Sequence, residues 1–311
     1  MEQDLSTPKR RKRWRSRLEA VEIKSMMDTA LKRGIREMEQ SGVDFLNDEV
    51  DHTNIAGCAI RLKNASDALE ILQRHKLELI NFAQDLKKAP RSITTPLHLA
   101  ARDGQLDVVK YLIDDLCFDV NERNKNGYTP IHQAAYNRDN EILSYLCAQH
   151  GANVNSEDYN GWVPLHLVCM QNTIAKNSNN FSAGFQDTEN VIEKIMILYT
   201  HGANLEAATT EGAKPIHFAA EALGGLGLLK ILVLFGANPE AKDSNNNTVY
   251  HYVVRGGRAD AGKTIEGLIK LGIKNAHHKN NNGETPRDIA QRASPKLVPL
   301  LEYAEKIERI R

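Results

Sequence analysis

The sequence has no long apolar run and few cysteines, and both absences exclude classes of protein. No stretch approaches the roughly 18 consecutive apolar residues of a membrane span, and the N-terminus lacks the apolar segment of a standard secretory signal. We therefore expect neither a span nor secretion by that route. The four cysteines are scattered without a CxxC pair, at Cys58, Cys117, Cys147 and Cys169. This spacing argues against a disulfide framework or a zinc knuckle, and a reducing compartment, cytoplasmic or nuclear, fits best.

Net charge is also absent, because 40 Lys and Arg balance 40 Asp and Glu, but the charge is unevenly placed. Segment 9–17, KRRKRWRSR, holds seven basic residues and no acid. One interpretation is a nuclear-import signal formed by Lys9, Arg10, Arg11, Lys12 and Arg13. A second is contact of residues 9–17 with an anionic membrane or a nucleic acid, with Trp14 as an anchor. A third is a flexible, solvated tail over residues 1–17.

What the sequence does contain is an internal repeat. Similar stretches begin near residues 95, 129, 163, 214, 248 and 285, at separations of 34, 34, 51, 34 and 37 residues. The first is TPLHLAARDGQLDVVKYL, and recurring ends such as GANVN (151–155) and GANLEA (202–207) accompany the series. Each unit predicts a short apolar helix, a turn, a second apolar helix and a glycine-ended cap. Helices this short need neighbouring units to bury their apolar faces.

These residues resemble the ankyrin-repeat family, whose signature is T-P-L-H-x-A at a period near 33. The resemblance covers residues 91–306 and implies an all-α solenoid of stacked helix-turn-helix units. The long third interval predicts a loop insertion within 171–190. Residues 18–90 predict a helical region that is either an N-terminal cap or a degenerate repeat, and 307–311 predict a C-terminal tail.

A histidine occupies the fourth position of five repeats: His98, His132, His166, His217 and His251. Adjacent repeats lie about 10 Å apart, too far for these histidines to share a zinc ion. The resemblance to ankyrin repeats implies that each histidine and the preceding threonine hydrogen-bond within the turn and link neighbouring units. Val163 and Lys214 lack the hydroxyl of Thr95 and Thr129, which puts the local bond in doubt there. Asp288 replaces the histidine in the last repeat. His277 and His278 lie in a polar turn without neighbouring Cys or paired acids, and we expect no metal there.

One stretch imitates a nucleotide-binding motif. GGRADAGKT (256–264) satisfies G-x-x-x-x-G-K-[ST] at Gly257, Gly262, Lys263 and Thr264. A working phosphate loop follows a strand, whereas YHYVV (250–254) is in the register of a repeat helix. We interpret the stretch as a turn between two helices. With no HExxH, G-x-S-x-G or convincing Cys–His pair, we predict no catalytic, cofactor or metal site.

Side chains at three kinds of position are the candidates for partner binding. Aromatic residues on the turns are Tyr128, Tyr159 and Trp162. The position seven residues after each repeat start is occupied by Arg102, Tyr136, Met170, Glu221 and Arg255. The insertion contributes Phe181 and Phe185. Two alternatives stay open: the turn aromatics pack on the adjoining turn, and the two phenylalanines fold back onto the solenoid.

The resemblance implies a non-enzymatic adaptor or scaffold that binds a protein through its concave face, and we expect a monomer. The family includes cytoplasmic scaffolds, nuclear regulators and effectors that intracellular bacteria deliver into host cells. The alternative is an unrecognised enzymatic activity in residues 1–90, with the repeats recruiting its substrate.

Overall fold

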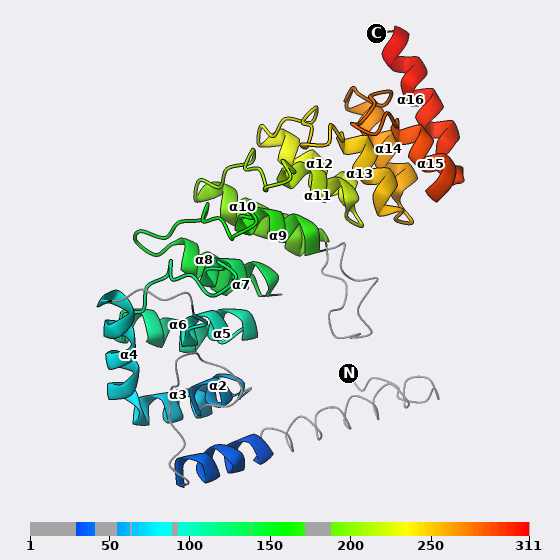
Figure 1. Cartoon of the computed structure of the whole chain (residues 1–311). Helices are drawn as coiled ribbons and strands as arrows, with labels where there is room; N and C mark the ends of the chain where they lie inside the picture. Colours follow the sequence, from blue (N-terminus) through cyan, green and yellow to red (C-terminus); the bar gives the residue numbers. More distant parts are fainter. Residues whose placement is uncertain are drawn as a thin grey trace, which may run out of the picture. The chain divides into compact units, whose positions relative to one another are not determined.

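A computed structural model describes residues 29–40, 55–62, 64–88, 93–137, 139–171 and 188–310. The regular structure of these residues is entirely helical, which confirms the predicted all-α class (Figure 1). The chain divides into two compact units, Met1–Asp119 and Val120–Arg311. We describe each by itself.

The described part of the first unit contains a helical segment over residues 29–40, two helix pairs and a further helix between the pairs. The first pair is α2 (Ile55–Ile60) and α3 (Ala65–Arg74), the helix between the pairs is α4 (Lys76–Lys88), and the second pair is α5 (Pro96–Asp103) and α6 (Leu106–Lys110), which continues into a π-helical turn, η1 (Tyr111–Asp115). α2 packs against α3 and α5, and α3 packs against α6. Every residue of α2 is buried. The pair α2–α3 therefore lies beside α5–α6 as one repeat lies beside the next.

The second unit is a stack of five helix pairs, each with a first and a second helix. The first helices are α7 (Pro130–Tyr136), α9 (Pro164–Met170), α11 (Pro215–Glu221), α13 (Val249–Gly256) and α15 (Pro286–Ala293). The second helices are α8 (Asn140–Cys147), α10 (Thr188–Thr200), α12 (Gly225–Leu234), α14 (Ala261–Lys270) and α16 (Val298–Ile310), and a short 3-10 turn, η3 (Pro295–Leu297), precedes α16.

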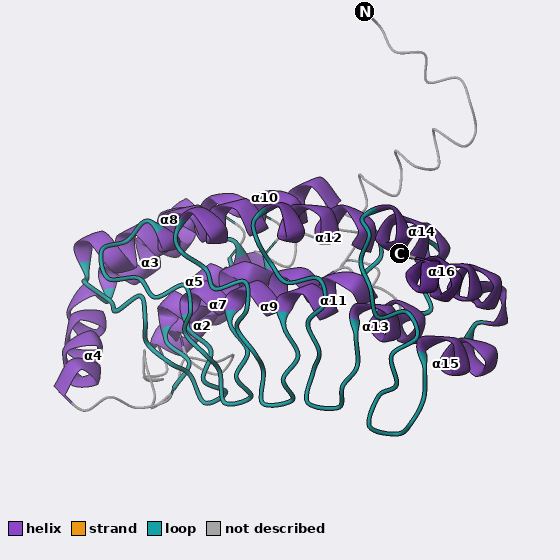
Figure 2. Cartoon of the chain, turned by 90° about the horizontal axis from the view of Figure 1, so that it is seen from above, coloured by secondary structure: helices purple, strands orange, loops and turns teal. Residues whose placement is uncertain are grey.

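Each first helix of the second unit packs on the next first helix, and each second helix on the next second helix. Figure 2 shows the two layers, with the turns that join successive repeats along one edge. Every first helix begins one residue after the predicted repeat start. Proline at the first helical position favours this start in α7, α9, α11 and α15, because its fixed φ suits a helix and it has no N–H to satisfy.

The stretch that imitates a phosphate loop is a turn between two helices. α13 ends at Gly256, and the residue that caps it, Gly257, has a φ of 54°, in the left-handed region. Lys263 and Thr264 lie in the first turn of α14, and the Thr264 hydroxyl donates to the main-chain oxygen of Asp260 at 3.3 Å. A helix precedes Gly257 where a phosphate loop requires a strand.

The C-terminal end differs from the sequence expectation. α16 continues through Ile310, so the segment predicted as a tail is helical as far as residue 310. Glu308 explains the extension: its carboxylate accepts the Ala276 N–H at 2.8 Å and contacts Nδ1 of His277 at 2.6 Å. These bonds hold the last turn of α16 against the preceding repeat.

Candidate protein-interaction surface

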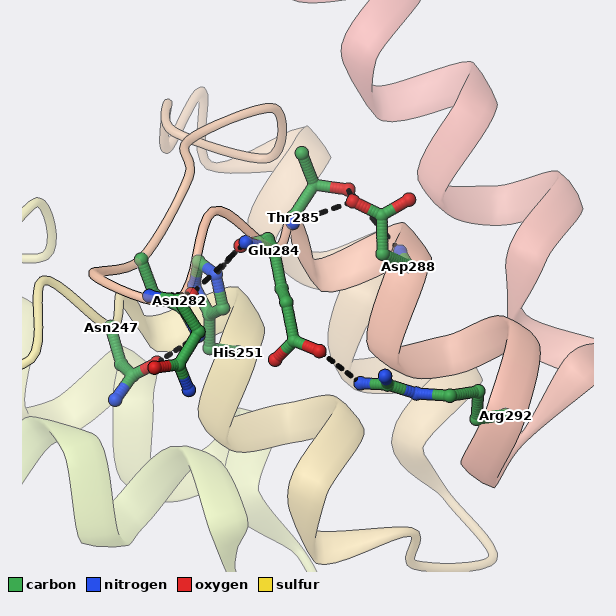
Figure 3. Close-up of polar contacts among 8 residues, drawn as sticks. Asn247, His251, Asn282, Glu284, Thr285, Asp288 and Arg292 are labelled. Carbon is green, nitrogen blue, oxygen red and sulfur yellow. Dashed lines mark hydrogen bonds and ion pairs between the residues drawn. The ribbon is translucent and has the colours of Figure 1, made fainter.

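The repeated histidines are structural groups that link consecutive repeats. The N–H of Thr129 donates to Nδ1 of His132 at 3.1 Å, so Nε2 holds the ring proton and donates to the Trp162 oxygen at 3.0 Å. Nε2 of His251 bonds the main-chain oxygen of Glu284, the matching position directly before the next repeat start, at 3.1 Å (Figure 3). The Nε2 atoms of His166 and His217 instead bond the oxygens of Ala207 and Ala241, seven residues before the next repeat start, at 3.0 and 3.1 Å.

The local bond that the sequence put in doubt is present in both repeats without a hydroxyl. The N–H groups of Val163 and Lys214 donate to Nδ1 of His166 and His217 at 3.0 and 2.9 Å. The doubt was misplaced because the donor is the main chain, which every residue supplies. The hydroxyl of Thr95, Thr129 or Thr248 only adds a second contact to the same ring nitrogen.

Burial keeps these rings neutral. It lowers the pKa of His132 and of His166 to about 4, since the interior disfavours the charged imidazolium. In the last repeat, Asp288 takes the same position and accepts the Thr285 N–H at 2.8 Å and its hydroxyl at 2.7 Å (Figure 3). These bonds hold the pKa of the Asp288 carboxyl below its usual value. The histidine positions thus serve the stack.

The aromatic residues just before the repeat starts pack on side chains of the first helices. The ring of Tyr128 stacks on His132 at a centroid distance of 5.3 Å. Trp162 lies 4.6 Å from the ring of Phe218 and meets His166 edge-on at 5.7 Å. Both side chains stay half-exposed. Their outer edges can touch a partner, and their inner edges contribute to the core.

Tyr159 is different because it projects from the turn with 57% of its surface exposed. The guanidinium of Arg123, from the preceding turn, lies 5.3 Å from the centre of its ring. Arg123 also donates to the main-chain oxygen of Glu157 at 2.6 Å. The pair therefore offers an ordered, exposed aromatic ring and cation at the turn edge. Arg123 was missed in the sequence, where the regular 34-residue spacing places it near Tyr159.

The row on the first helices is uneven, as predicted. Tyr136, Met170 and Glu221 are half-buried and Arg255 is exposed. Two members of the row pair: Nη2 of Arg255 lies 3.1 Å from Oε2 of Glu221. The Arg255 guanidinium also lies 4.1 Å from the centre of the Tyr252 ring. Tyr252 was missed, although its position one helical turn before Arg255 places it beneath that side chain.

Asp243 fixes the Tyr252 ring and the turn that precedes α13. It accepts the Tyr252 hydroxyl at 3.0 Å and the main-chain N–H groups of Asn245 and Asn247 at 2.9 and 2.8 Å. The Arg255 cation thus contacts the Glu221 carboxylate and a Tyr252 ring that Asp243 holds in place. Such a group can meet a partner with little loss of side-chain freedom.

The other predicted positions lie elsewhere. Arg102 belongs to the first unit, on the last turn of α5, where its Nε lies 2.8 Å from Oδ1 of Asp103. Phe181 and Phe185 of the insertion, and Lys9–Arg13 of the basic segment, lie outside the described residues. Among the described side chains, no three His, Cys, Asp or Glu gather closely enough to hold a metal ion. No described helix is long and apolar enough to cross a bilayer.

A buried lysine was also missed. Lys194 of α10 is fully buried, and its Nζ donates to the main-chain oxygens of Ala135 (3.2 Å) and Asn137 and to Oε1 of Gln171 (3.1 Å). α7 ends at Asn137 in an extended conformation, whereas left-handed glycines end α5 and α13. The lysine supplies donors to carbonyls that a glycine cap would have satisfied. Burial lowers its pKa to about 7.

A stack of two-helix units joined by histidine-to-carbonyl bonds defines a helical repeat protein of the kind that binds other proteins. The ankyrin-repeat family model, three copies long, matches residues 56–158 and 97–177. The match spans residues 56–177 and supports an ankyrin-repeat architecture for this part of the chain.

The chain is also similar to a putative ankyrin repeat protein of fowlpox virus (strain NVSL), FPV024. The two are 27% identical over 113 residues, which is 36% of this chain and 18% of the viral protein. The aligned region is thus less than a fifth of the length of that relative.

Proposed function

We propose that this chain is a non-enzymatic adaptor that binds a protein partner through the first helices and turn edge of residues 120–311. The observation that supports this most is two exposed, ordered positions: Tyr159, with Arg123 over its ring, and Arg255, whose guanidinium lies on the buried ring of Tyr252. Aromatic and arginine side chains dominate the energetics of protein interfaces. The links between consecutive repeats do not depend on these groups alone, since the histidines also bond from one repeat to the next.

The test is partner capture with the full chain beside a Tyr159→Ala/Arg255→Ala double variant. These two residues are exposed, so their removal costs little stability. Alanine at Trp162 or Tyr128 would instead remove packing on His166 or His132. A loss of partner binding could then result from unfolding. Tyr303→Ala is the control, because Tyr303 is similarly exposed but lies on α16, in the other layer.

A protein that is held by the parent and by Tyr303→Ala but lost from the double variant supports the proposal. Circular dichroism and thermal unfolding of all three chains show whether the fold is unchanged. Retention of the same proteins by the double variant contradicts the proposal and moves attention to other surfaces.

We propose further that segment 9–17 directs this adaptor to the nucleus, as a regulator or as an effector in a host cell. The support is its seven basic residues without an acid. Replacement of Lys12 and Arg13 by alanine in a fluorescent fusion is expected to abolish nuclear accumulation. Unchanged distribution of that variant contradicts this part of the proposal and leaves the adaptor proposal standing.

A further inference from the structure

A second surface lies at the C-terminal ends of three adjacent second helices, α10, α12 and α14. These helices pack side by side in the layer opposite the first helices (Figure 2). Large apolar side chains are exposed along this edge: Met196, Tyr199, Leu234 and Leu271. We call this set the outer apolar edge. It shares no residue with the adaptor surface proposed above.

Two of the three helices meet on this edge through their rings. The rings of Tyr199 on α10 and Phe235 at the end of α12 stack at a centroid distance of 4.1 Å and an interplanar angle of 2°. Phe235 and Leu271 occupy equivalent positions, each directly before the glycine that follows its helix. Leu234 projects beside this stack with 75% of its surface exposed, whereas Tyr199 retains 39%. A single protruding leucine beside a fixed ring stack makes a shallow, ordered apolar surface.

The charge along this edge has one sign. The exposed cations are Lys230 on α12, Lys270 on α14 and Lys274 just beyond it. The stretches 194–201, 230–236 and 269–275, which form the edge, contain no Asp or Glu. The acids of these helices, Glu189, Glu193 and Glu266, lie further toward the helix N-termini. Glu206, in the turn beyond α10, pairs with Lys214 at 2.7 Å.

We propose that the outer apolar edge docks an acidic amphipathic helix of a partner protein. Apolar contact with Leu234, Tyr199 and Leu271 would supply affinity, and Lys230, Lys270 and Lys274 would pair with carboxylates flanking the apolar stripe. Helices in contact lie 8–10 Å apart, so three helices present about 20 Å of edge. A helix of about 13 residues has that length. A bilayer favours several protruding side chains at one depth, and only Leu234 protrudes strongly here.

The test uses a labelled synthetic helix of about 14 residues, with leucines at i, i+3, i+4 and i+7 and glutamates on both flanks. Fluorescence anisotropy measures its binding to the full chain. Parent protein is expected to bind it with an affinity that falls as salt rises, because the carboxylate–lysine pairs are screened. A peptide with lysine in place of every glutamate should not bind.

Two variants of the edge locate the site. Leu234→Asp and Lys230→Glu/Lys270→Glu should each weaken binding on the order of tenfold or more. Leu77→Asp is the matched control, because Leu77 on α4 is also 75% exposed and should bind the peptide like the parent. Thermal unfolding of each variant shows whether the fold is kept.

Absence of binding by the parent, or equal binding by Leu234→Asp, overturns the proposal. Phosphatidylserine vesicles form the second arm. If they sediment the parent but not Leu234→Asp while the acidic peptide fails to bind, the edge contacts lipid and the proposal is wrong. Neither failure bears on Tyr159 and Arg255, which lie on other elements.

Discussion

Nε2 of His132 donates to the main-chain oxygen of Trp162 across 3.0 Å, so the first helix of one repeat holds the residue before the next helix start. His251 repeats this relationship with Glu284, and His166 and His217 bond oxygens earlier in the turn that leads to the next repeat, those of Ala207 and Ala241. Each ring satisfies a donor within its own turn and an acceptor in the following repeat. One histidine side chain per repeat therefore fixes the position of that repeat relative to the next.

Replacement of this ring should destabilise the stack. His166→Ala leaves the buried Val163 N–H and Ala207 oxygen without their partner and opens a cavity beside Trp162. We expect the free energy of unfolding to fall by about 2–4 kcal/mol. Urea denaturation measures it. His150→Ala, at an exposed position, should change it by less than about 0.5 kcal/mol. Equal effects of the two substitutions would contradict this account.

Acid should weaken the fold through the same rings. An unfolded histidine has a pKa near 6.5, and folding lowers the pKa of His132 and His166 to about 4. Between these values the unfolded chain binds more protons, so the free energy of unfolding decreases as pH falls. At pH 5 the loss is about 2 kcal/mol for each ring. Urea denaturation between pH 7 and pH 5 measures it. The slope should be shallower in a His132→Gln/His166→Gln variant, and an unchanged slope would refute the assignment.

Lys194 should make stability rise with pH above neutrality. Its folded pKa is about 7, against about 10.5 in an unfolded chain, so the unfolded chain binds more protons between these values and the native state gains as pH increases. In Lys194→Met this dependence should vanish between pH 7 and pH 9. The variant also leaves the oxygens of Ala135 and Asn137 without this donor, which should cost about 1–3 kcal/mol at pH 7. A parallel pH dependence in both proteins would show that another group is responsible.

Alanine substitutions at two turn glycines distinguish the stability cost of backbone strain from that of steric crowding. Gly151 and Gly161 have φ values of 80° and 74°, so alanine is strained at both. A Cβ at Gly151 meets nothing within 4 Å, whereas one at Gly161 lies 3.1 Å from the Thr210 nitrogen. Gly151→Ala should cost about 1 kcal/mol. Gly161→Ala should cost more, because the turn of the next repeat must move. Thermal unfolding measures the loss of stability in each variant. Equal losses would mean that the adjacent turn moves aside at no measurable cost.

The periodic features of this fold could be predicted from the sequence, because they depend on local patterns. The TPLH-like starts place each first helix of the second unit to within one residue. The turn between α13 and α14 also follows from register, despite the phosphate-loop letters. The sequence left the histidine bonds at Val163 and Lys214 in doubt, because neither residue has a side-chain hydroxyl. The donor is the main-chain N–H, and the residue type does not reveal that it points at the ring.

The remaining features depend on which side chains neighbouring repeats bring together. Nothing local marks Lys194 as buried; its partners lie on α7 and at Gln171, 23 to 59 residues away. The register placed Glu221 and Arg255 in one row without showing that they pair. The sequence presented Trp162 as an interface candidate. Its contact with the Phe218 ring shows that part of the side chain packs inside the stack.

The histidine-to-carbonyl bonds have a kinetic consequence. They join residues only 24 to 41 positions apart, and the helices of the second unit pack mainly on those of adjacent repeats. No pair of distant segments must find each other before any repeat gains stability. Folding can nucleate at any adjacent pair of repeats and spread in both directions, and partial unfolding from an end leaves the remaining repeats intact.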